Sequence, residues 1–95
     1  MVKIIWTQLA IDDLKSIHGY ISTESKVYAN SMIEKLIVRV RQLERFPQSG
    51  KIVPEFGQKS IRELIEGNYR IVYKIHHDHI GIARVHHAAR LLKKV

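Results

Sequence analysis

The sequence predicts an α+β domain in which a helical hairpin packs on one face of a small, mainly antiparallel four-stranded sheet. Three observations predict this fold. A short apolar run opens the chain, two stretches with helical periodicity follow it, and three strand-like segments separated by turn residues fill the second half. The order β-α-α-β-β-β leaves one face of the sheet without a helix. The 95 residues suffice for a single domain, and we expect no second one.

The first half of the chain predicts one strand and two helices. The apolar run from Val2 to Trp6 has strand character. The Thr7 hydroxyl can cap a helix over residues 8–22, whose apolar positions form one stripe. Ser25 can cap a second, longer helix that extends to about Phe46, where Pro47 ends it.

The second half predicts a loop and then a three-strand meander. Residues 48–60 contain two glycines and a proline, which favours a loop rather than a strand. Strands are expected over residues 61–65, 69–76 and 80–85, with turns at 66–68 and 77–78 and a short helix or irregular tail over 86–92. Alternation in the central strand sends one set of side chains to each face. The two sets are Tyr69, Ile71, Tyr73 and Ile75, and Arg70, Val72, Lys74 and His76.

Positive charge is concentrated in the meander half. The net charge is +7, and residues 49–95 hold five of the six His and most of the excess Lys and Arg. Such a chain attracts acidic or phosphate-rich partners. Composition alone supports equally well the interpretation that this charge only keeps the protein soluble. The lack of Cys excludes disulfides and thiolate metal sites, and no long apolar run predicts a membrane span. We therefore expect a cytoplasmic protein that needs no cofactor.

Basic and imidazole side chains are the candidate functional groups of the predicted open face. Arg can hold a phosphate and His can act as a general acid or base, so the set is compatible with metal-free RNA cleavage. Any basic protein of this size has some such residues, so the compatibility is weak. The loop residue Lys51 is a candidate wall of the site, and His76, His77 and His79 indicate an exposed turn rather than a metal site. The candidates on the face are Arg62, Arg70, Lys74, Arg84, His86, His87 and Arg90.

Several motifs resemble those of the RelE/ParE superfamily of toxins. They are A-x-x-D-L-x-x-I-x-x-Y-I from Ala10 to Ile21, F-P-x-S-G at 46–50, V-P-E at 53–55, R-E-L-I-x-G-N-Y-R-I-V-Y at 62–73 and V-H-H-A-A-R-L-L at 85–92. The resemblance covers nearly the whole chain in order. It implies the fold predicted above and a toxin of a type II toxin–antitoxin module, which arrests growth until a small cognate antitoxin neutralises it. Toxin–antitoxin pairs of this kind can assemble further, as a heterotetramer.

The resemblance implies one of two targets. RelE-like members cut mRNA on the ribosome, and in that case Arg62, Arg70, His86 and His87 would be catalytic. ParE-like members poison DNA gyrase without catalysis. The V-H-H-A-A-R ending and the absence of any Tyr after Tyr73 favour the ParE branch. In either branch the expected target- or phosphate-binding residues are Lys51, Lys74, Arg84 and Arg90.

Overall fold

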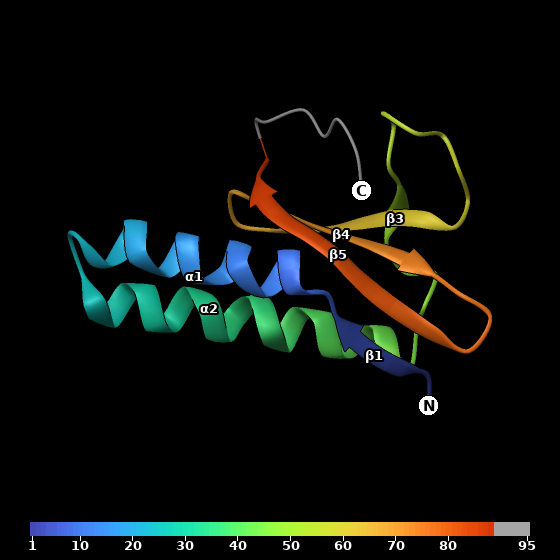
Figure 1. Ribbon diagram of the computed structural model, residues 1–95, viewed down its shortest axis with the longest axis horizontal. Coiled ribbons are helices and arrows are strands. Elements are labelled where there is room, and N and C mark those ends of the chain that lie inside the picture. Colours follow the sequence, from blue (N-terminus) through green and yellow to red (C-terminus); the bar gives the residue numbers. More distant parts are fainter. Residues whose placement is uncertain (89–95) are drawn as a thin grey trace.

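The structure is a computed structural model that describes residues 1–88 (Figure 1). The elements follow in the order β1 (Lys3–Trp6), α1 (Gln8–Ser22), α2 (Lys26–Arg41), the 3₁₀ turn η1 (Gln42–Glu44), β2 (Lys51–Ile52), β3 (Ile61–Glu66), β4 (Tyr69–Ile75) and β5 (His79–His87). Both helices run side by side along one face of the sheet, and their connecting turn extends past its end (Figure 1). Within this part of the chain, no helix is long and apolar enough to cross a membrane.

The helix starts agree with the sequence prediction. Thr7 accepts a hydrogen bond from the Ala10 N–H at 3.1 Å, and Ser25 accepts one from the Tyr28 N–H at 3.1 Å. Each hydroxyl satisfies a backbone donor that the first helical turn leaves unpaired. The predicted end of the second helix is too late, because α2 gives way at Gln42 to one 3₁₀ turn.

The sheet has five strands rather than four, in the order β1-β5-β4-β3-β2. β1 is parallel to β5, and the other neighbours are antiparallel. The segment predicted as a loop contains β2, whose Lys51 and Ile52 pair with Glu63 and Arg62. A two-residue strand carries too little periodicity to be recognised in sequence.

The last strand is also longer than predicted. β5 continues through His86 and His87, which pair with Arg70 and Tyr69, so neither residue begins a terminal helix. Pairing with β4 satisfies backbone groups at this end of β5, which favours extension of the strand. The predicted terminal element beyond residue 88 lies outside the described residues.

The main core fills the space between the helices and the sheet. Leu36 and Leu43 from the helical layer meet Ile71, Tyr73 and Ile80 from the sheet, all fully buried. The alternation predicted for the central strand is confirmed, since Tyr69 and Ile75 also pack against this core. Trp6 is partly buried against it, as a strand residue facing the helices should be.

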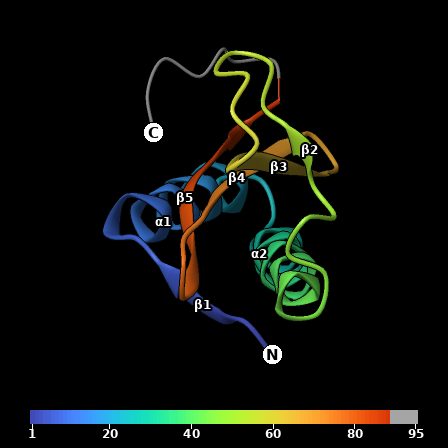
Figure 2. The same ribbon diagram turned by 90° about the vertical axis from the view of Figure 1, so that its right-hand side faces the viewer.

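The opposite face is only partly open. The loop between β2 and β3 lies on the side of the sheet away from α2 (Figure 2). Its Val53 and Phe56 pack on Ile61 and Val72, forming a second apolar cluster. The expectation of one open face is therefore wrong for the part of the sheet over β3 and β4. This packing removes the apolar side chains of the loop and of Ile61 and Val72 from water, which stabilises the fold.

Candidate functional site

A charged cluster lies under the edge of this covering loop. The Arg70 guanidinium donates to both Glu55 carboxylate oxygens, at 2.7 and 3.0 Å, and its Nε donates to Glu63 Oε1 at 2.5 Å. Arg70 is only 6% exposed and Glu63 only 3% exposed. The hydrogen bond to Glu55 is the main cause that raises the pKa of Arg70 above its ordinary value, with Glu63 adding to it. The cation is thus held by two carboxylates in a largely water-excluded position.

The sequence builds this cluster from three elements. Glu63 lies on β3 and Arg70 on β4, both on the face away from the helices, since the flanking residues Leu64 and Ile71 enter the main core. Glu55 is brought over them by the loop that Val53 anchors. Lys51 Nζ adds a second cation 3.7 Å from Glu63 Oε2. Two positive and two negative side chains therefore offset one another, which contradicts the expectation of a basic open face at this place.

Arg62 lies on the other side of the sheet from Arg70. It pairs with Tyr73, whose ring is in the main core, and its guanidinium donates to the carbonyl oxygens of Lys59, Gln48 and Gly50 at 2.9, 3.3 and 3.0 Å. Three carbonyl acceptors hold the segment before β2 and the segment before β3 together. The two meander arginines predicted to share a site are not brought together.

The two histidines at the end of β5 are divided in the same way. His86 is opposite Arg70 in the neighbouring strand, so it shares that face, and it is 7% exposed. His87 is exposed on the helix side, where its ring meets Tyr69 edge-on with centroids 5.9 Å apart. Of the four predicted catalytic residues, the structure brings only Arg70 and His86 together.

The other predicted binding residues have separate surroundings. Arg84 donates to both carboxylate oxygens of Asp13 in α1, at 2.8 and 3.0 Å, and this hydrogen bonding raises the pKa of Arg84. Asp13 also accepts from the Val85 N–H, so it fastens α1 to the edge of β5 beyond β1. Lys74 is exposed on β4, and Arg90 lies outside the described residues.

Sequence reasoning missed the carboxylate partners of these arginines. Glu55 belongs to the V-P-E motif and Glu63 directly follows Arg62, but no local pattern indicates that either will face Arg70. Asp13 lies within α1, and no local pattern indicates that it is the acceptor for Arg84. The signal that could have found Glu63 is strand alternation, which places it on the face of Arg70 once the hairpin register is known.

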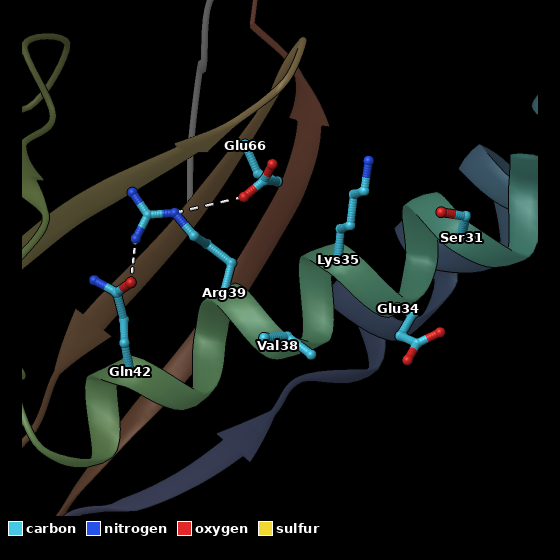
Figure 3. A pocket seen from close by; sticks show the side chains of 7 residues that line it. All are labelled: Ser31, Glu34, Lys35, Val38, Arg39, Gln42 and Glu66. Carbon is cyan, nitrogen blue, oxygen red and sulfur yellow. Dashed lines mark hydrogen bonds and ion pairs between the residues drawn. The ribbon is translucent and has the colours of Figure 1, made fainter.

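A second candidate surface was also missed, the groove between α2 and the end of β3 (Figure 3). It has a volume of about 600 Å³. Arg39 reaches from α2 toward β3, with its Nε 3.7 Å from Glu66 Oε1, and it also donates to Gln42. Lys35 projects along the same wall, and Val38 is an exposed apolar residue on the helix (Figure 3). The groove combines two cations and two carboxylates with exposed apolar surface, and it is lined by Ser31, Glu34, Lys35, Val38, Arg39, Gln42 and Glu66.

The histidine turn between β4 and β5 has stacked rings. The imidazoles of His76 and His79 lie 4.4 Å apart, with 11° between their planes, and His79 Nδ1 is 2.7 Å from Asp78 Oδ1. The hydrogen bond with His79 is the main cause that lowers the pKa of Asp78. Among residues 1–88, no group of three or more His, Asp or Glu side chains is arranged to hold a metal ion.

Comparison with known proteins identifies the family. The model of the family described as ParE toxin of type II toxin-antitoxin system, parDE, matches residues 4–92. Toxin RelE2 of Caulobacter vibrioides is 32% identical over 92 residues, which are 96% of this chain and 100% of the relative.

Two solved structures share the fold. A chain of the chromosomal ParDE system from P. aeruginosa superposes with a TM-score of 0.76 at 21% identity, over 92% of this chain and 96% of that one. The YoeB dimer from Staphylococcus aureus gives a TM-score of 0.58 at 20% identity, over 87% and 92%. At these identities the two likenesses show the fold alone. The family match and the curated relative show more: the chain belongs to the ParE toxin family of the RelE/ParE superfamily, the toxins of type II toxin–antitoxin systems, and has a cognate antitoxin as its partner.

Proposed function

We propose that this toxin acts by binding and poisoning DNA gyrase rather than by cutting RNA. The observation that carries the proposal is the division of the predicted nuclease residues between the two faces of the sheet. Arg62 is held by three carbonyls on the helix side, and His87 lies on that side as well, whereas Arg70 is clamped between Glu55 and Glu63 on the other. A metal-free nuclease needs its cation and its proton-transfer groups around one phosphate.

Purified gyrase and a translation extract test this proposal directly. The toxin at micromolar concentration should inhibit supercoiling and increase the amount of gyrase-cleaved DNA, and the purified cognate antitoxin should reverse both effects. The toxin alone should leave ribosome-bound mRNA intact. Cleavage of mRNA without any effect on gyrase would reject the proposal in favour of the RelE-like reading, and the absence of both activities would reject both.

The RelE-like alternative has its own supporting observation. Arg70 and His86 are opposite one another across β4 and β5, and the curated relative carries the name Toxin RelE2. In that reading a phosphate would have to displace Glu55 from Arg70. Loss of mRNA cleavage on His86→Ala, with cleavage retained on His87→Ala, would support this alternative, provided that both variants stay folded.

The groove between α2 and β3 is the surface that we propose for part of the antitoxin. The exposed Lys35 suits an acidic segment, whereas Arg39 already lies near Glu66. The exposed Val38 offers apolar contact to one face of an amphipathic segment that folds on binding. Hydrogen exchange of the complex tests this placement. Unchanged protection of α2 and the end of β3 would contradict it.

A further inference from the structure

The Lys and Arg side chains on the strands of this toxin differ in whether they contact an acidic or carbonyl group of the same chain. Four of the six Lys and Arg side chains in the described strands are occupied. Lys51 is near Glu63, Arg70 is clamped by Glu55 and Glu63, Arg84 binds Asp13, and Arg62 binds carbonyls. The two others, Lys3 in β1 and Lys74 in β4, form no ion pair with another residue of the described chain.

These two lysines share one region of the sheet. Val2, Ile4 and Trp6 pack into the main core, so Lys3 points to the opposite face, and the alternation in β4 sends Lys74 to that face too. Only β5 separates their strands, with Lys3 opposite His79 and Lys74 opposite Gly81. From the spacing of strands and of residues along them, their Cα atoms are about 12 Å apart.

The stacked histidines lie in the same region. His79 lies beside Lys3, and the His76 ring lies over Gly81, since a Cβ at Gly81 would be 3.5 Å from His76 Nε2. We call Lys3, Lys74, His76 and His79 the basic patch. The only ion pair that these four side chains make with described residues is the contact of His79 with the exposed Asp78.

We propose that the basic patch binds the phosphate backbone of duplex DNA. Duplex DNA carries about one negative charge per 1.7 Å of its length, so a surface about 12 Å across faces several phosphates. Lys ammonium groups on flexible stems bind phosphates as point charges without requiring a fixed geometry. Imidazoles can donate to phosphate oxygens, and they gain charge when they protonate.

The chemistry of the patch favours a phosphate backbone over an acidic amphipathic peptide. Such a peptide gains much of its affinity by burying apolar side chains in a groove. The patch itself consists of two Lys and two His side chains. Beside it, Ile5 is an exposed apolar side chain on the same face of β1. The choice of DNA over RNA rests on the proposed action on gyrase, an enzyme that holds DNA.

Binding of the isolated toxin to a fluorescent duplex of about 20 base pairs tests the patch without gyrase. We expect Lys3→Ala/Lys74→Ala to weaken binding about tenfold or more at 0.1 M salt. The slope of log affinity against log salt should become shallower by about 1.8, or 0.9 for each lost phosphate contact. The matched control Lys15→Ala/Lys26→Ala removes the same charge from the exposed helical layer and should keep the slope of the unaltered toxin.

The outcomes separate this inference from the proposed function. An unchanged slope in the Lys3/Lys74 variant, or an equal loss in the control, would contradict DNA binding by the basic patch, whatever the result of the gyrase assay. Tighter binding of single-stranded RNA, or of a Glu-rich peptide of matched charge, through the same two lysines would overturn the assignment to DNA. Duplex binding that depends on these lysines would support the patch even if gyrase were unaffected, in which case only the proposed target would fail. Circular dichroism of each variant verifies that it is folded.

Discussion

Arg70 is a buried cation with two carboxylate partners, and each partner has a different exposure. Glu63 is almost fully buried on β3, whereas Glu55 reaches in from the loop and its side chain is 18% exposed. Removal of a buried charge leaves its partners desolvated and uncompensated, which costs more than the pair contributes. The consequences of substitution should therefore fall in the order Arg70, Glu63, Glu55.

Substitution of Arg70 by Met should destabilise the fold by about 3–5 kcal/mol, because Glu63 would remain buried with only Lys51 near it. Glu55→Gln should cost about 1 kcal/mol or less, since Arg70 keeps Glu63. Urea unfolding measures both. The double variant Arg70→Met/Glu63→Gln should regain part of the loss, and strict additivity of the two single effects would contradict this account. Loss of toxicity in an Arg70 variant is therefore not evidence of a catalytic role.

At the level of elements, the sequence predicts the features that depend on local periodicity and on capping residues. Both helix starts, the turn at Gly67 and the two faces of β4 follow from local pattern. Gly67 has a positive φ of 58°, which a glycine adopts readily. β2 could not be predicted, because its two residues are a strand only through their pairing with β3. The loop over residues 48–60 was predicted, but its packing on the sheet could not be predicted for a similar reason. Its Val53 and Phe56 are too few to form a pattern, and their burial depends on Ile61 and Val72 from other strands.

Gly50 should be the position where β2 is most sensitive. A Cβ there would lie 2.6 Å from the Glu63 carbonyl oxygen and 2.6 Å from the Tyr73 hydroxyl, both fixed by the sheet and core. Gly50→Ala should therefore destabilise by about 1–3 kcal/mol. Gly19→Ala is the matched control in α1, where a Cβ meets nothing within 4 Å, and it should stabilise by about 0.5–1 kcal/mol. Thermal unfolding compares them, and a neutral Gly50→Ala would show that β2 can shift freely.

At the level of the whole molecule, composition predicts the net charge but not where that charge acts. The sequence gives +7 and correctly places most of it in the meander half. It does not reveal that Glu55, Glu63 and Asp13 offset the arginines nearest to them, because each pair joins residues that are distant in sequence or separated by a turn. The family could be recognised from motifs that span the chain, whereas the arrangement of the candidate site required the strand register. Charge that remains available to a partner is therefore a property of the fold.

The fold should lose stability in alkali through its buried tyrosines. Tyr73 is fully buried; its hydroxyl donates to the Pro47 carbonyl at 2.8 Å and accepts from the Gly50 N–H at 2.9 Å. Burial raises the pKa of Tyr73 above 10, against smaller opposite effects of Gly50 and Arg62, and burial also raises the pKa of Tyr69. Near pH 10 the unfolded chain loses these protons first. The stabilisation is therefore complete below about pH 10 and is lost as the pH rises above it.

Urea unfolding of the toxin and two variants between about pH 8 and 11 measures this loss. Tyr73→Phe should be less stable at pH 8 by about 1–2 kcal/mol, because the Gly50 N–H and the Pro47 carbonyl lose their partner. Its stability should nevertheless decline less steeply above pH 10, since it has one buried phenol fewer to ionise. Tyr20→Phe changes a side chain that is 79% exposed and should follow the decline of the unaltered toxin. If all three curves fall in parallel, the alkaline loss comes from other groups, such as the lysines, and not from Tyr73.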